Sequence, residues 1–239
     1  MVGHRRGGVF TLNARTSATG WAGPCTFREF PLEEWPDGRA TGLRGVLTHG
    51  EGRVEDRRGT LLVSVALEGR GTDWSAAHLA HWRLDTVQGT LLPKPDLTMT
   101  LTAHDGFFVG VHLDSVLANL HVGDQRVEFT APRLVAGDTL FTLQGLGQWS
   151  GAHWTVDLDA ARAHSAQFDW TAEPPMRLSG DARGTVFDRV VAHDGAAHLE
   201  VSGRWASPEG AYDCRLEGHD LDKGPCRIAR PAYLRCMDG

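Results

Sequence analysis

The sequence has no long apolar run, no block of one charge and few cysteines, and each absence excludes a class of protein. No stretch is long enough to span a bilayer, and the basic start at Arg5 and Arg6 is not followed by an apolar segment, so we expect no signal peptide. The 24 basic and 30 acidic side chains are dispersed along the chain and sum to −6. We therefore expect no nucleic-acid partner, because neither charge gathers into a surface that could follow a phosphate backbone.

Cysteine is scarce and lacks the spacing of a metal site. The residues Cys25, Cys214, Cys226 and Cys236 contain no C-x-x-C pair, and three of them lie in the last part of the chain. A zinc site is therefore not expected. A disulfide among the last three, which requires an oxidising compartment, and unpaired thiols both remain open.

Catalytic and cofactor motifs are also missing. There is no G-x-S-x-G elbow, phosphate-binding loop or dinucleotide fingerprint. Most of the 12 histidines are expected at turns or strand ends, where the ring is solvated, and the pair His78 and His81 has no third ligand at a metal-binding interval. Asp157 and Asp159 lie two apart, the spacing that an exposed strand face produces by alternation. We expect no enzyme, no metal and no cofactor.

Alternation of apolar and polar residues is the dominant feature from about residue 60 to residue 203, and it predicts a succession of strands. No window shows a helical period, and residues 74–82 are interpreted as irregular. The tight turns that should join the strands as antiparallel hairpins are marked by Gly and Asp at residues 104–106, 122–124, 136–138 and 193–195. Three regions are expected: a poorly ordered or partial segment at 1–35, a repetitive β region at 36–222 and an irregular tail at 223–239.

The strands share one apolar face, and no helical layer is predicted to cover it. The residues expected on this face are Leu97, Met99, Leu101, Phe129, Phe141, Leu143, Trp154, Val156, Leu158, Phe168, Trp170, Leu199 and Val201. Two architectures satisfy the pattern. A second sheet could close over the face in a sandwich or barrel, or the sheet could curve into an open groove whose lining receives acyl chains.

A phrase of strand, glycine and tryptophan recurs along the chain. It is found at residues 67–74, 143–149 and 201–205, and the second copy continues into the segment from Phe168 through Trp170 and Pro174 to Leu178. From about residue 40 to residue 222 this arrangement resembles the middle of TamB proteins, relatives of the AsmA group.

The resemblance implies a function as well as a fold. It implies an elongated, curved and mainly antiparallel sheet, the β-taco, in a periplasmic protein anchored in the inner membrane. The groove of such a protein would carry phospholipid acyl chains between the inner and outer membranes and support outer-membrane protein assembly, together with an outer-membrane barrel partner. TamB-like chains are much longer, so the resemblance implies that this chain is an internal segment. The alternative is a closed all-β sandwich that binds carbohydrate or protein.

Overall fold

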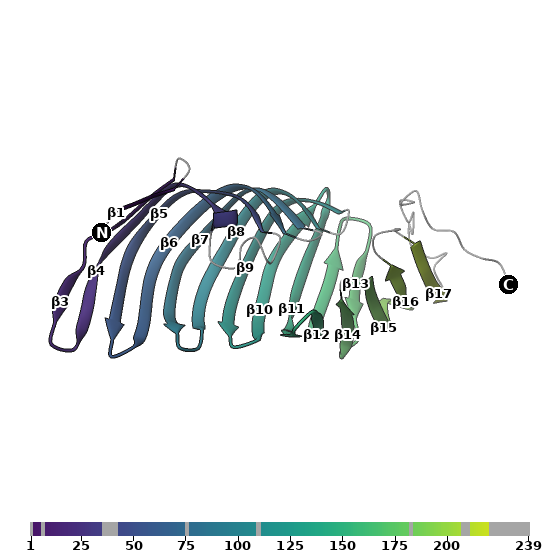
Figure 1. Cartoon of the computed structure of the whole chain (residues 1–239). Helices are drawn as coiled ribbons and strands as arrows, with labels where there is room; N and C mark the ends of the chain where they lie inside the picture. Colours follow the sequence, from purple (N-terminus) through teal and green to yellow (C-terminus); the bar gives the residue numbers. More distant parts are fainter. Residues whose placement is uncertain are drawn as a thin grey trace. The chain divides into compact units, whose positions relative to one another are not determined.

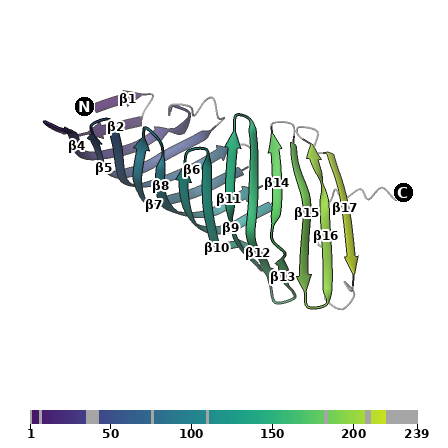
Figure 2. The ribbon, with the colours of Figure 1, turned by 90° about the horizontal axis from the view of Figure 1, so that it is seen from below.

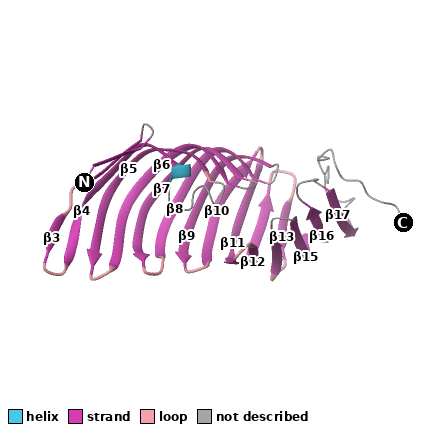
Figure 3. Ribbon diagram, in the orientation of Figure 1, coloured by secondary structure: helices cyan, strands magenta, loops and turns pink. Residues whose placement is uncertain are grey.

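The computed structural model describes residues 2–5, 8–34, 43–74, 77–108, 111–181, 184–206 and 211–219. These residues form strands joined by short turns, with one 3-10 helix and no α-helix among them (Figures 1 and 3). Period-2 alternation therefore determines the architecture, and the prediction of an all-β, antiparallel, curved and open sheet is confirmed.

The chain divides into two compact units, Met1–Asp124 with Arg133–Gly137 and Gln125–Pro132 with Asp138–Gly239. The first unit contains β1 Val2–Arg5, β2 Gly8–Leu12, β3 Arg15–Ser17, β4 Gly20–Pro31, the 3-10 helix η1 Leu32–Glu34, β5 Arg44–Arg57, β6 Thr60–Trp74, β7 Ala77–Leu92, β8 Asp96–Phe108 and β9 Val111–Gly123. From β4 to β9 each strand pairs antiparallel with the next, while β2 and β3 both pair with β4.

The second unit repeats this sequential pairing with shorter strands. β10 Arg126–Ala136 is divided between the units, and the strands that follow are β11 Thr139–Ser150, β12 His153–His164, β13 Asp169–Ala172, β14 Met176–Asp181, β15 Gly184–Asp194, β16 Ala197–Ala206 and β17 Ala211–His219. Both β13 and β14 pair with β12 and with β15, so together they act as one interrupted strand. Figure 2 shows the two short strands side by side with β12 and β15.

Irregularities in the ladders explain why the strands of the first unit bend, as β5 to β9 visibly do in Figure 1. The register shifts between Leu47 and His49, between Val65 and Leu67, and between Asp85 and Gln88. An extra residue on one strand of a pair bends that strand and increases its local twist. At the third shift Thr86 has a φ of 52°, a left-handed conformation that a β-branched residue seldom adopts.

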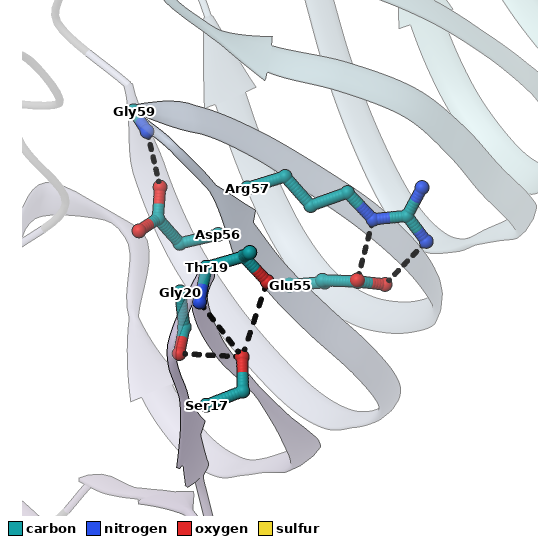
Figure 4. Close-up of polar contacts among 7 residues, drawn as sticks. All are labelled: Ser17, Thr19, Gly20, Glu55, Asp56, Arg57 and Gly59. Carbon is teal, nitrogen blue, oxygen red and sulfur yellow. Dashed lines mark hydrogen bonds and ion pairs between the residues drawn. The ribbon is translucent and has the colours of Figure 1, made fainter.

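Polar contacts close the strand ends at one edge of the first unit (Figure 4). The β5–β6 turn at Arg58 and Gly59 has positive φ at both residues, as a two-residue hairpin turn of type I′ requires, and the Gly59 amide donates to Asp56 Oδ1 at 3.0 Å. In the β3–β4 turn, Ser17 Oγ donates to the Gly20 carbonyl at 3.2 Å. These contacts fix where each strand reverses and therefore which residues face each other across the ladder.

Three expectations from the sequence are corrected here. Residues 1–35 were expected to be a poorly ordered or partial segment, yet the described residues of this range form β1 to β4 and η1, because Gly and Pro at strand positions hid the alternation. Residues 74–82, interpreted as irregular, contain the end of β6 and the first part of β7. Residues 104–106 lie inside β8 rather than at a turn, with Asp105 at a φ of 54°.

The other turn signals are confirmed, since turns follow Gly123, Ala136 and Asp194. The tail expected at 223–239 lies outside the described residues.

Candidate functional site

One face of the first unit carries unbroken rows of apolar residues, and we call it the apolar face. Directly opposed residues in neighbouring strands point to the same side of a sheet, so the register defines each row. The central row crosses β2 and β4 to β9 through Phe10, Phe27, Gly50, Leu67, Leu84, Leu101 and Ala118. No charged or polar side chain interrupts it. Six strand spacings of about 4.8 Å make this row about 29 Å long.

A second row runs beside the central one, nearer to the ends of the same strands. It consists of Phe30, Leu47, Gly69, Trp82, Ala103 and Val116. On β8 the apolar face continues through Met99 to Leu97, which opposes Val122 of β9. The apolar face is therefore several side chains wide along each strand as well as continuous across the strands.

The two rows of this face differ in burial, and the central row is the more exposed one. Leu47 and Ala103, in the second row, are each 1% exposed, whereas Leu67, Leu84 and Leu101 of the central row are only half-buried. Only eleven hydrophobic residues of the described chain are buried. A closed sandwich would bury both inner faces along their whole length. The central row therefore keeps apolar surface within reach of another molecule.

Tryptophan rings compensate for glycines on the apolar faces of both units. Trp82 of β7 is the register partner of Gly69 on β6, and a Cβ placed on Gly69 would lie 2.2 Å from the Trp82 ring. The ring is held in place because Trp82 Nε1 donates to Thr72 Oγ1 at 2.7 Å. In the second unit the ring of Trp154 similarly lies over Gly180, where a Cβ would be 2.5 Å away. Gly69 of the strand, glycine and tryptophan phrase is thus covered by Trp82 of the next strand rather than by a tryptophan of the phrase, and each ring fills the space above a residue without a side chain.

The second unit has its own apolar face, with shorter rows. One row contains Gly147, Val156, Leu178, Phe187 and Gly203 on successive ladders, and another joins Gly145 and Leu158 to Met176. Met176 is 2% exposed, while its neighbours in the first row are half-buried. Val127 of β10 lies on this face too, because its Cγ1 would be 3.0 Å from a Cβ on Gly147.

The residues expected to line a groove are divided between the two units. Leu97, Met99 and Leu101 lie on the apolar face of the first unit. On that of the second unit lie Phe141, Leu143, Trp154, Val156, Leu158, Trp170, Leu199 and Val201, and alternation from Val127 places Phe129 there.

One residue of the expected lining needs correction, and several were missed. Phe168 precedes β13 and is not part of a strand; the loop there is held by the Ser165 amide, which donates to the Phe168 carbonyl at 2.9 Å. Sequence reasoning missed Phe10, Phe27 and Leu84 because they lie in segments interpreted as disordered or close to one interpreted as irregular. Their signal was alternation, which glycine, proline and bulges had obscured.

The opposite face carries cross-strand ion pairs. Arg177 Nε donates to Asp157 Oδ1 at 2.6 Å, and this hydrogen bond lowers the pKa of the Asp157 carboxyl. On the first unit Arg83 Nη1 donates to Glu68 at 3.0 Å across the β6–β7 ladder. The register shift in β11 and β12 leaves Asp159 without a residue opposite it, so the two aspartates do not act as a pair. In both units the strands therefore present charged side chains on one face and apolar rows on the other.

Cys25 is the one cysteine whose side chain lies in the described part of the chain. Its thiol is free and 1% exposed on β4, and burial raises its pKa. A buried thiol with a raised pKa is a poor nucleophile, so this residue packs as a small apolar side chain. Cys226 and Cys236 lie outside the described residues.

Neither metal ligation nor comparison with known proteins assigns a site. Within the described ranges, no three His, Cys, Asp or Glu side chains are grouped so that they could hold a metal ion. His78 Nδ1 instead contacts Asp73 Oδ1 at 2.7 Å. The same ranges contain no helix with the length and apolar character needed to span a bilayer. No family model, curated protein or solved structure matches the chain. The candidate site is therefore defined by the apolar faces alone.

Proposed function

We propose that the apolar faces bind acyl chains, and that the chain is a segment of a β-groove protein that conducts phospholipid. The observation that carries the proposal is the central row of the first unit, which is uninterrupted from Phe10 to Ala118 and half-buried at its middle leucines. Each methylene that leaves water for such a surface contributes about 0.8 kcal/mol. A row about 29 Å long exceeds the roughly 15 Å hydrocarbon thickness of one leaflet.

Binding on this surface would be broad in specificity. The row contains no polar side chain that could recognise a headgroup or a double bond. Affinity would therefore increase with acyl length and depend little on headgroup chemistry, as suits a surface along which lipids move rather than one that stores a single ligand.

The finer parts of the proposal rest on the resemblance to TamB and AsmA proteins. These parts are a periplasmic location, transfer between the inner and outer membranes and support of outer-membrane protein assembly with a barrel partner. The alternative function, a sandwich module that binds carbohydrate or protein, requires a covered apolar face. The half-buried Leu67, Leu84 and Leu101 favour the acyl-chain function over it.

Site-specific photo-crosslinking tests the proposal with neighbouring residues that point to opposite faces. A photoreactive amino acid at Leu101 should capture phospholipid in cells, whereas one at Thr102 should not, and Val156 and Thr155 form the same kind of pair on β12. Equal capture within each pair, or none at Leu101 and Val156, would overturn acyl-chain binding.

A charge substitution in the second unit adds an independent test. In Val156→Asp a carboxylate replaces a half-buried side chain that opposes Leu178, and an open surface lets that carboxylate remain hydrated. We expect the variant to keep its thermal transition and to lose binding of a fluorescent fatty acid at that position. An unfolded variant, combined with a parent that never crosslinks lipid, would indicate a closed core instead.

A further inference from the structure

Two histidines on β15 and β16, one of them paired with Glu173, form a cluster outside the apolar faces. His193 and His198 are direct partners across the ladder, and their ring centroids lie 4.8 Å apart. Their Nδ1 atoms approach each other to 3.4 Å. His193 follows Ala192 and His198 precedes Leu199, and Ala192 and Leu199 oppose each other on the apolar face. Alternation therefore places the two imidazoles on the opposite, polar face of the sheet.

The separation of the two nitrogen atoms matches the geometry of a metal site. Zn²⁺ binds imidazole nitrogen at about 2.0 to 2.1 Å, and two ligands on a tetrahedral ion at that distance are about 3.4 Å apart. Imidazole also suits Cu²⁺ and Ni²⁺. Without a metal ion, the two Nδ1 atoms can share at most one hydrogen bond, in which one ring donates to the other. An ion between them would instead accept the lone pairs of both nitrogens.

Glu173 prepares one of the rings for this role. Its Oε1 lies 2.5 Å from Nε2 of His193, which directs the imidazole proton to Nε2 and leaves the Nδ1 lone pair facing His198. The backbone amide of Glu173 donates to the Val191 carbonyl at 2.8 Å, which fixes the carboxylate beside β15. A carboxylate that accepts from the second nitrogen of a ligand histidine is the usual outer partner in protein metal sites.

We propose that His193 and His198 bind a divalent transition-metal ion, Zn²⁺ or one of similar preference, through their Nδ1 atoms, with Glu173 as a positioning residue. Water completes the coordination, since the His193 side chain is 39% exposed and solvent reaches the cluster. Asp194 is already engaged, because its Oδ2 accepts from the Asp169 amide at 3.0 Å. The site is independent of lipid binding, because it lies on the other face.

Titration of the apo protein with Zn²⁺ and Co²⁺ tests the site. We expect one Zn²⁺ per chain by calorimetry and a visible Co²⁺ spectrum of the intensity that four-coordinate sites give. His193→Ala and His198→Ala should each lower the affinity at least tenfold. His78→Ala is the matched control, because His78 also contacts a carboxylate but has, among the described residues, no second imidazole within hydrogen-bond distance. The metal affinity of this variant should equal that of the parent.

Glu173→Gln separates positioning from folding. It keeps the side-chain length and removes the charge, and we expect about a tenfold loss of metal affinity, an altered Co²⁺ spectrum and an unchanged thermal transition without metal. A parent that binds no Zn²⁺, or His193→Ala and His198→Ala variants that bind it as tightly as the parent, would overturn the proposal. Equal losses in all variants, His78→Ala included, would also overturn it.

Discussion

Both units are built from strands that pair antiparallel with the next strand in the chain, but the two units differ in which strand is interrupted. In the first unit the strands from β5 to β9 are 13 to 16 residues long, and the interruption between β2 and β3 lies on one side of β4. In the second, β13 and β14 have 4 and 6 residues and lie between β12 and β15. Pro174 and Pro175 occupy the gap, and neither can donate to a ladder. The first unit also has a proline within an interior strand, Pro24 of β4, but this proline does not divide its strand. The apolar rows are therefore longest where the interior strands stay whole.

Burial does not follow the same difference. Met176, at the interruption of the second unit, is 2% exposed, but Leu47 and Ala103 in uninterrupted strands of the first unit are each 1% exposed. Half-buried apolar side chains lie beside buried ones in both units. Variants that compare buried with half-buried positions test this contrast.

The largest effect is expected when a carboxylate replaces a fully buried side chain in either unit. Leu47→Asp and Met176→Asp should each lower the free energy of unfolding by about 3 kcal/mol or more, because each side chain is at most 2% exposed. Leu84→Asp should cost much less, since its carboxylate can reach water. Chemical denaturation measures all three, and a Leu84→Asp variant as unstable as Leu47→Asp would show that the central row is covered.

Sequence alone predicts the strands and the apolar face best where alternation is undisturbed. Leu97, Met99 and Leu101 were assigned correctly to one face, because every second residue of β8 up to Ala103 is apolar. Leu84 could not be placed in the central row, since its position depends on register shifts in β6 and β7 that no local residue pattern specifies.

The pairing of His193 with His198 was equally hidden from the sequence. Both residues border the turn at Gly195, where a solvated ring was the natural interpretation. Only the register reveals that the two rings oppose each other, and only the path from β13 to β14 brings Glu173 to His193. When a site needs residues from two neighbouring strands, the register of the hairpin decides which residues meet, and local sequence patterns specify that register only weakly.

A middle-sized effect should distinguish how the two units accommodate a ring over a glycine. Gly69→Ala should cost about 1 to 3 kcal/mol, because the three atoms nearest to the new Cβ all belong to the Trp82 ring. Adding Trp82→Leu should recover part of that loss, since the clash is with a side chain that can be replaced.

Gly180→Ala is the counterpart, and there the recovery should fail. The new Cβ would meet the Gly184 carbonyl oxygen at 2.6 Å as well as the Trp154 ring, and no side-chain substitution moves a backbone atom. Double-mutant cycles in denaturant measure both couplings. If Trp154→Leu rescues Gly180→Ala as fully as Trp82→Leu rescues Gly69→Ala, the backbone contact is unimportant and the proposed difference is wrong.

The smallest effect concerns acid stability, where the second unit should be more sensitive. Hydrogen bonds from arginines lower the pKa of Asp157, Asp169 and Glu200 in this unit, whereas Glu55 is the described carboxyl of the first unit with a lowered pKa. A carboxyl whose pKa is lower in the folded state stabilises the fold above its unfolded pKa, about 3.9 for Asp, and this contribution is lost as the pH falls through the folded value.

We therefore expect the second unit to lose protection more steeply than the first as the pH falls below about 4, measured by hydrogen exchange corrected for intrinsic rates. The effect should be modest, because the partners are exposed and solvent screens them. Asp157→Asn should flatten the pH dependence in the second unit, and Glu55→Gln should leave that unit unchanged. Asp157→Ala should also leave lipid capture at Val156 intact, because the carboxylate lies on the polar face. Loss of capture in this variant would mean that the two faces are not independent.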